Sequence, residues 1–173
     1  MIFPVSFRAA LAAVLLAGPA LAGPQYVDAS GYAVSGYDPV AYFDLPQAAE
    51  GQSQPAPVPG RADITAEHNG ATFAFASEAN RDRFLADPAR FAPQFDGHCA
   101  YGVAVGGKVP ANPTLWRIVD DRLYLNIDAK VARKWQRDIP GYVADAAENW
   151  PGLEPRPASP DAVPGFASDA PVN

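Results

Sequence analysis

The stretch "HNGATFAFASEANRDRFLADPARFAP", residues 68–93, contains the strongest local structural signals in the chain. Asn69-Gly70 is the favoured dipeptide for a two-residue hairpin turn. After this turn, Phe73 and Phe75 alternate with small residues, which is the pattern of a half-buried strand. A β-hairpin with Asn69-Gly70 at its tip is therefore predicted over residues 63–77.

A helix is predicted directly after this hairpin. Ser77 is a preferred N-cap residue, and Phe84 and Leu85 are expected to face the core. Asp87-Pro88 ends or offsets the helix, because proline disfavours helical geometry in the residue before it.

Similar signals continue on both sides. Asp38-Pro39 is typical of an N-cap followed by the first helical residue, and a second hairpin is predicted about Asp120-Asp121. Residues 100–104 alternate in size after a glycine-containing loop and are expected to form a short strand. Asp128 is predicted to cap a final helical region that Pro140-Gly141 divides in two. The predicted fold class is α+β, with short antiparallel β-hairpins packed against helices.

The N-terminus has the pattern of a secretory signal peptide. Arg8 precedes an apolar run over residues 9–17, and Ala20-Leu21-Ala22 matches a cleavage site, so residues 1–22 are predicted to be removed. The apolar run is too short to span a bilayer. We expect a protein secreted across the inner membrane, located in the periplasm and without a membrane anchor after cleavage.

Composition limits the classes of function. After cleavage, 12 basic and 19 acidic residues remain, a net charge of −7 that argues against nucleic-acid binding. The single cysteine, Cys99, cannot form an internal disulfide, so the fold must depend on its hydrophobic core.

Two proline-rich segments are expected to lie outside the packed core. Residues 46–60 contain few large apolar side chains and are predicted to be a flexible surface loop. Residues 151–173 have a similar composition and are predicted to be a disordered tail, because they bury too little surface to offset chain entropy. The folded domain is expected over residues 23–150.

The ordered motifs of residues 68–93 resemble the YHS domain, which combines a hairpin, a Ser-capped helix and a "DP" followed by an aromatic residue. The flanking stretches "AVSGYDPVAYF" and "GHCAYGVAVG" are similar to an exported bacterial subgroup of YHS proteins. The resemblance covers residues 33–151 and implies a treble-clef-like core. YHS domains are thought to bind metal ions, and some occur beside copper-transporting ATPases.

The metal site that this resemblance implies is incomplete. The related treble-clef domains carry cysteines immediately before the helix-capping serine and three residues after it, where this chain has Ala76 and Asn80. The exported subgroup instead has its cysteine at the position of Cys99. Some relatives are reported to carry selenocysteine there, which would imply redox use.

Cys99, in the stretch "GHCAYG" of residues 97–102, has three readings. It is a small buried core residue, a soft metal ligand, or a redox or nucleophilic thiol. Thiolate with imidazole suits copper or zinc, so His98 is the candidate second ligand, and His68 is a third if the first hairpin folds over this stretch.

Three more residues are candidates for a supporting role. Tyr37 and Asp38 belong to a well-matched stretch and are candidates to face Cys99, although a carboxylate there would raise the thiol pKa. Tyr101 would share the face of Cys99 in a strand. Their alternative roles are helix capping for Asp38 and core packing for Tyr101.

Three functions therefore stay open. The first is a non-enzymatic module that binds a soft metal, copper before zinc, through Cys99 and His98. The second is a redox protein in which Cys99 is the catalytic thiol and an external thiol is the partner. The third is a non-catalytic interaction domain with Cys99 in its core.

Overall fold

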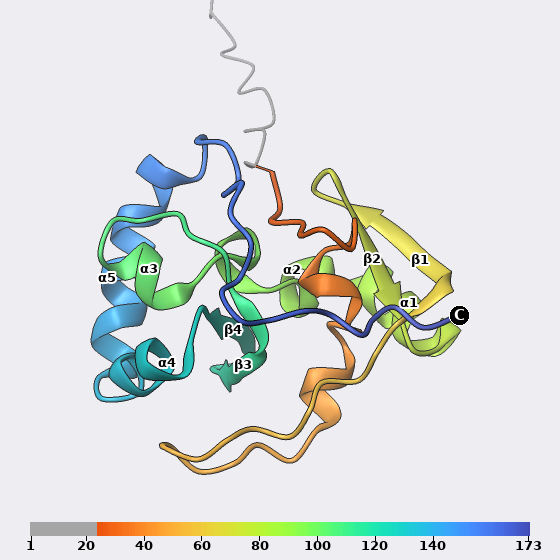
Figure 1. Cartoon of the computed structure of the whole chain (residues 1–173), viewed down its shortest axis with the longest axis horizontal. Coiled ribbons are helices and arrows are strands. Elements are labelled where there is room, and N and C mark those ends of the chain that lie inside the picture. Colours follow the sequence, from red (N-terminus) through yellow and green to blue (C-terminus); the bar gives the residue numbers. More distant parts are fainter. Residues whose placement is uncertain (1–23) are drawn as a thin grey trace, which may run out of the picture.

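Two antiparallel hairpins organise residues 24–173, the part of the chain that the computed structural model describes (Figure 1). β1 (Arg61–His68) pairs with β2 (Ala71–Phe75), and β3 (Asn112–Val119) pairs with β4 (Arg122–Asn126). Asn69 at the first turn and Asp120 and Asp121 at the second have positive φ angles of 48°, 47° and 57°. Asn and Asp tolerate this left-handed region better than most residues, and both hairpin predictions are confirmed.

Helices connect and cover the hairpins. The α-helices are α1 (Glu78–Ala86), α2 (Pro88–Phe91), α3 (Ala100–Ala104), α4 (Ala129–Trp135) and α5 (Ile139–Leu153), and the 3₁₀ helices are η1 (Val34–Gly36), η2 (Ala41–Asp44) and η3 (Gln94–Gly97). The side chains of Ser77 and Asp128 cap α1 and α4, as predicted, by accepting bonds from the N–H groups of Asn80 and Val131. None of the helices in residues 24–173 has the length and apolar character needed to cross a membrane.

The described chain therefore has the predicted α+β class, with five α-helices and two separate two-stranded sheets in residues 24–173. The treble-clef arrangement stays a prediction. The signal-peptide prediction for residues 1–22 lies outside the described residues.

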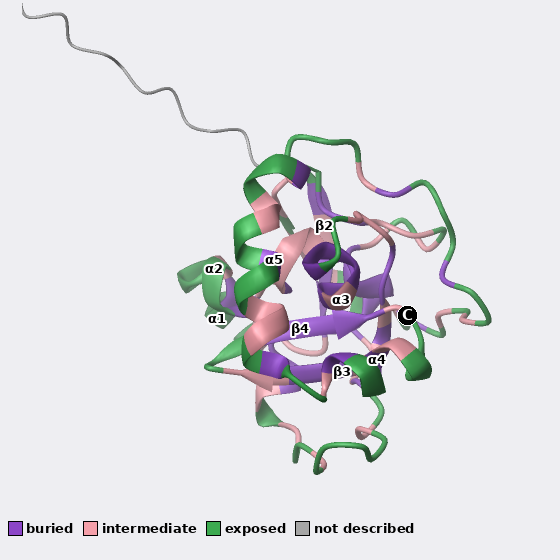
Figure 2. Cartoon of the chain, turned by 90° about the vertical axis from the view of Figure 1, so that its left-hand side faces the viewer, coloured by how far each residue is buried: buried purple, intermediate pink, exposed green. Residues whose placement is uncertain are grey.

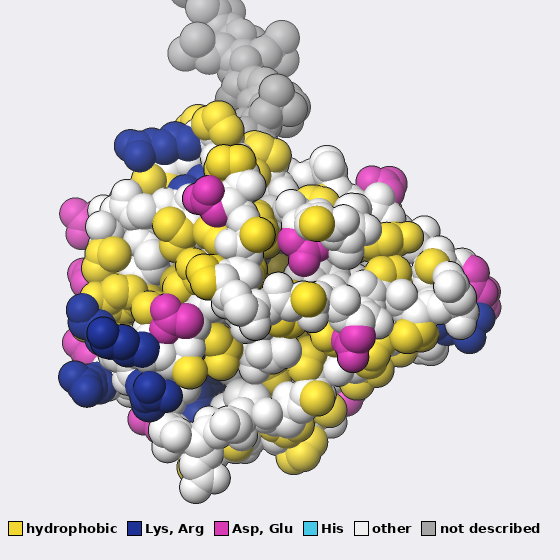
Figure 3. Space-filling model, in the orientation of Figure 1, with side chains coloured by type: hydrophobic (Ala, Val, Ile, Leu, Met, Phe, Trp, Pro, Cys, Tyr) yellow, Lys and Arg dark blue, Asp and Glu magenta, His cyan; other side chains and the backbone are white. Residues whose placement is uncertain are grey.

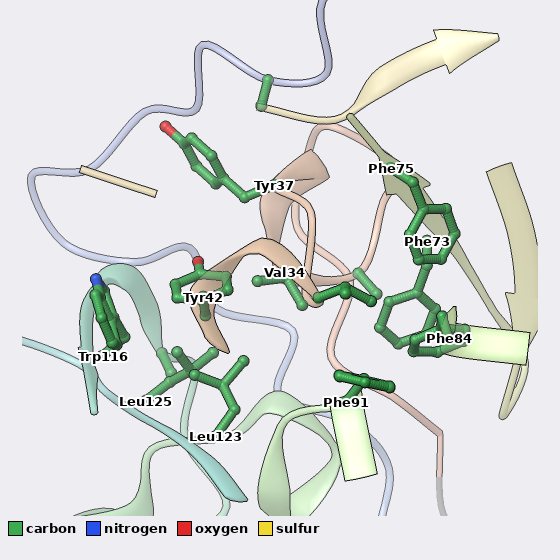
Figure 4. Close-up of a cluster of buried hydrophobic side chains, with 14 of the residues drawn as sticks. Val34, Tyr37, Tyr42, Phe73, Phe75, Phe84, Phe91, Trp116, Leu123 and Leu125 are labelled. Atoms are coloured by element: carbon green, nitrogen blue, oxygen red, sulfur yellow. The ribbon is translucent and has the colours of Figure 1, made fainter. Parts of the chain in front are cut away.

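One apolar core joins the two hairpins. In Figure 4, Phe73 and Phe84 come from the side of β2 and α1, and Trp116 and Leu125 come from β3 and β4. Tyr42 lies between these groups and packs edge-on against the Trp116 ring, with centroids 5.4 Å apart. β4 is buried along most of its length (Figure 2). The core thus depends on aromatic packing rather than on a disulfide.

Two local predictions are wrong. Leu85 is 54 % exposed, and Phe84 is the one buried residue of α1. Residues 100–104 form the helix α3 instead of a strand, and four of its five residues are buried. α3 packs against α5, so tertiary contacts override the short alternating pattern.

The prediction of a disordered tail is also wrong. After α5, the chain crosses the front of the molecule to β1 (Figure 1) and buries Ser159, Val163 and Ala170. Val172 forms a parallel bridge to Arg61 at the outer edge of β1, with its carbonyl accepting from the N–H of Ala62 at 2.8 Å. Residues 154–173 are called the strap below. The prediction rested on side-chain composition, but backbone hydrogen bonds hold much of the strap in place. Its prolines also lower the entropy cost of ordering it.

The predicted loop at residues 46–60 has no regular structure over most of its length and is largely exposed. Four bonds join it to β3 and α4. Trp116 Nε1 donates to the carbonyl of Pro55, Arg117 to that of Ala48, the Ile118 N–H to Gln47 Oε1, and the Gly51 N–H to Gln136 Oε1. The loop therefore lies against β3 and α4.

Candidate functional site

His98 is fully buried and fully hydrogen-bonded. Its Nδ1 lies 3.0 Å from the carbonyl of Phe95, and its Nε2 accepts from the N–H of Ser159 at 3.3 Å. Since Nε2 accepts, the proton lies on Nδ1, which donates to Phe95. Burial lowers the pKa of His98 to about 4, so the ring is neutral at pH 7. His98 therefore ties the strap to the body of the protein.

Cys99 is also fully buried, at the N-cap position of α3. Its Sγ accepts from the Gly102 N–H at 3.4 Å and donates to Asn126 Oδ1 at 3.6 Å. The same amide oxygen accepts from the Tyr101 N–H at 3.3 Å. Burial raises the pKa of the thiol above its ordinary value, which disfavours the thiolate. This is the environment of a core residue.

These residues do not fit the metal that the YHS resemblance implies. A metal would have to displace the backbone partner of one His98 nitrogen and reach a thiol with no exposed surface. His68 lies elsewhere, with its ring against Phe73 and Phe84 at centroid distances of 6.2 and 5.6 Å. No three His, Cys, Asp or Glu side chains in residues 24–173 form a group that could hold a metal ion. Metal binding through Cys99, His98 and His68 stays a prediction that the geometry does not favour.

The supporting candidates make structural contacts. The Tyr37 hydroxyl donates to Asp169 in the strap, and burial together with this bond raises its pKa to about 12. The Asp38 carboxylate bonds to backbone and side-chain groups of its own turn and of α1. The Tyr101 ring packs edge-on against Tyr142 at 5.1 Å. The hydroxyl of Tyr37 and the carboxylate of Asp38 are therefore engaged away from Cys99.

We expect the Cys99 thiol to be unreactive in the native protein. Ellman's reagent should label it at least about 100-fold more slowly than in urea, because reaction requires local opening and a thiolate. A control variant places the only thiol on the exposed face of α1, Leu85→Cys in a Cys99→Ala background, and should react at once. Fast native labelling of wild type would instead support the redox reading.

A different group of residues forms an open pocket of about 320 Å³. It lies where the β1–β2 turn meets η3 and the last turns of α5. Its polar and aromatic lining residues are His68, Asn69, Gln94, Phe95, Asp96 and Trp150. Its size is at the lower end of the range for small-molecule sites.

Asp96 is the distinctive group in this pocket. Its Oδ1 accepts from Asn69 Nδ2 at 2.7 Å, whereas its Oδ2 is inaccessible and has no hydrogen-bond partner among residues 24–173. Burial raises the pKa of Asp96 to about 6, with the nearby charge of Lys108 acting in the opposite direction. An unpaired buried acceptor is costly, and perturbed carboxyl groups in clefts are candidates for functional sites.

The backbone that carries Asp96 is strained. Phe95, Asp96 and Gly97 are consecutive residues with positive φ angles of 57°, 51° and 74°. Non-glycine residues in this region cost about 1–3 kcal/mol each and persist only where the surroundings hold them. Here the Asp96 carbonyl accepts from the Tyr26 N–H at 2.8 Å. The fold therefore fixes the position of this carboxyl group.

Two aromatic rings form the apolar part of the lining. Phe95 and Trp150 pack at 60° with centroids 5.5 Å apart. Lys108 Nζ lies 5.2 Å from the Trp150 ring and donates to the carbonyls of Glu154 and Arg156. The pocket thus combines a carboxyl group with aromatic surface in its lining.

Sequence reasoning did not single out Asp96 or Trp150. Asp96-Gly97 has the composition of a turn, and a single tryptophan such as Trp150 is more typical of a core than of a binding site. Asp96 and Trp150 become candidates only because the fold brings them to one pocket with Asn69. Asn69 lies more than 20 residues before Asp96, so no local sequence pattern predicts this contact.

We expect Asp96→Asn to stabilise the protein at neutral pH. The folded pKa of about 6 lies above the ordinary 3.8, so the folded state binds more protons and wild-type stability falls as pH rises through 4 to 6. The neutral amide avoids this cost and tolerates positive φ, so the variant should gain about 1–2 kcal/mol at pH 7.5 and nothing near pH 4. Urea unfolding across this pH range measures the difference.

His98 acts with the opposite sign. Its folded pKa of about 4 lies below the ordinary 6.5, so stability is lost as pH falls through that window. Removing the Asp96 contribution should make the acid-side loss steeper in Asp96→Asn than in wild type. Asp145→Asn, at an exposed position of α5, is the control and should change neither slope. A pH-independent effect of Asp96→Asn would contradict this account.

Comparisons with known proteins give no relative for this chain. No family model, no curated protein and no solved structure matches it.

Proposed function

We propose that this chain is an exported, non-enzymatic binding module of the YHS type that holds a small organic ligand in the Asp96 pocket. The observation that carries the proposal is the unpaired, inaccessible Oδ2 of Asp96 within an aromatic-lined pocket. A buried acceptor without a donor is destabilising, so we expect the Asp96 side chain to turn toward a ligand that supplies the donor.

The strained turn supports the same proposal. Positive φ at Phe95 and Asp96 costs stability, yet it holds Asp96 among the lining residues of the pocket. Functional sites commonly lower the stability of the folded protein in return for contacts with a ligand.

The test is a set of ¹H–¹⁵N spectra of the mature chain with three probes of one shape and different charge: phenethylammonium, 2-phenylethanol and 3-phenylpropanoate. The proposal expects at least one probe to shift the Trp150 indole, the Asn69 side-chain amide and the Asp96 backbone signal together. Ala92→Phe, which fills the pocket, should abolish these shifts, while Ala147→Phe on the exposed side of α5 should not. No coordinated shift with any probe would reject the pocket as a binding site.

Copper and thiol chemistry are tested separately, because both require Cys99 to leave the core. An anaerobic Cu(I) titration of wild type beside Cys99→Ala tests the copper hypothesis, and the labelling with Ellman's reagent described above tests the thiol hypothesis. Tight one-to-one binding lost in the variant would make Cys99 a ligand and reverse our preference.

A further inference from the structure

We infer that the Asp96 pocket selects small organic cations that carry an N–H donor, of the arylalkylammonium class. This inference rests on the proposed function and adds the chemical class of the ligand. It follows from the charge, the hydrogen-bonding capacity and the aromatic lining of the pocket.

The first step concerns the positively charged partner that the Asp96 carboxylate lacks in the described part of the chain. The five ion pairs found in residues 24–173 do not include Asp96, and the only hydrogen bond described for its carboxylate comes from the neutral amide of Asn69. The charge of Lys108 acts on Asp96, but its Nζ donates to the carbonyls of Glu154 and Arg156 and forms no ion pair with the Asp96 carboxylate. A positively charged ligand can therefore be the ion-pair partner of Asp96, although it also meets repulsion from Lys108.

The second step concerns hydrogen bonding. Among the described residues Oδ2 has no donor, but it also has no accessible surface, so binding requires the Asp96 side chain to turn toward the ligand. An anion or a pure acceptor would then leave the carboxylate unpaired and add repulsion. A neutral hydroxyl would satisfy it, but an ammonium N–H would form a charge-assisted bond, which is about twice as strong. The donor is thus expected to be charged.

The third step concerns the apolar part of the ligand. The rings of Phe95 and Trp150 favour an aromatic or aliphatic body, and their faces attract cations. Trp150 already has one cation over its ring, that of Lys108. The pocket volume of about 320 Å³ suits a body the size of a phenylethyl group.

The surface charge is mixed, because Lys108 lies over Trp150 and beside Arg156, whereas a group of other basic side chains lies farther from the pocket. Exposed basic side chains gather over α4 (Figure 3), namely Lys130, Arg133 and Lys134. α4 adjoins the first turn of α5, whereas Trp150 lies in its last turns. The net charge of the mature chain, −7, also attracts cations to the molecule.

The experiment is calorimetric titration of the mature protein with phenethylammonium, 2-phenylethanol, 3-phenylpropanoate and phenethyltrimethylammonium at pH 7.5. The primary ammonium should bind about 10-fold more tightly than the alcohol, and the anion should not bind. The trimethyl cation keeps the charge but has no N–H donor, so it should bind more weakly than the primary ammonium.

Variants identify the group responsible. Asp96→Asn should remove the preference for ammonium over alcohol while leaving the alcohol bound, and Asp145→Asn should leave all affinities unchanged. Equal or tighter binding of the alcohol or the anion in wild type would overturn the inference and keep the pocket. Absence of binding by all four probes would overturn the inference together with the proposed function.

Discussion

Asp38→Ala is expected to lower the free energy of unfolding by about 3–5 kcal/mol, the largest loss that we predict for a single polar side chain. Asp38 is fully buried. Its Oδ1 accepts from the N–H groups of Val40 and Ala41 at 2.8 and 3.2 Å, and its Oδ2 accepts from the Ala76 N–H and from Asn80 Nδ2 at 2.8 and 2.7 Å. The alanine variant leaves four donors without this acceptor.

The size of the effect follows from which segments the carboxylate joins. One oxygen holds the turn before η2, and the other holds the end of β2 and the first turn of α1, about 40 residues later in the chain. Asp38→Asn should lose almost as much, because its NH₂ group would face other donors on one side.

Urea denaturation of the purified variants measures this loss. Asp128→Ala is the matched control, since Asp128 is an exposed N-cap that accepts one backbone bond, and it should cost about 1 kcal/mol. A loss at Asp38 no larger than that at Asp128 would show that the four bonds contribute little to stability.

Deletion of residues 157–173 is the second large prediction, with an expected loss of about 3–4 kcal/mol. A disordered tail would be removable without cost. This strap instead buries Val163 and Ala170 and supplies the donor to His98. Chain termination after Arg156 keeps the carbonyls that bind Lys108, so the loss reports the strap itself.

Point substitutions can test the strap without shortening the chain. Gly36 has a φ of 84°, and a Cβ there would overlap the backbone of Pro171, so Gly36→Ala should displace the end of the strap. Gly31 has a φ of 83° with open space around it, so Gly31→Ala carries the same backbone strain without the overlap. Thermal unfolding should show a clearly larger loss at Gly36. Equal losses would mean that the strap end adds no stability.

The hairpins and helix caps were predictable because short-range chemistry determines them. Asn69-Gly70 and Asp120-Asp121 tolerate positive φ, and Ser77 and Asp128 cap helices with their own side chains. These signals act within four residues and need no knowledge of the rest of the chain.

The pocket and the strap were not predictable in the same way. Asp96 acquires its unusual environment only because Asn69 and Trp150 approach it from distant elements. The strap is held by backbone bonds to β1 and to His98, and backbone groups are identical in every sequence. Cys99 is a candidate from the sequence because it is the single cysteine of the chain. That fact does not predict whether the thiol is exposed, and the core accommodates Cys99 as a small apolar residue.

The strap also has a consequence for the order of events during folding. Residues 170–172 lie against Gly36, Arg61 and the carbonyl of Gly60, so these contacts close loops of about 110 to 135 residues. The chain entropy of such loops is lost before the contacts form, which makes non-local pairing slow. We therefore expect the strap to dock after the two hairpins have formed.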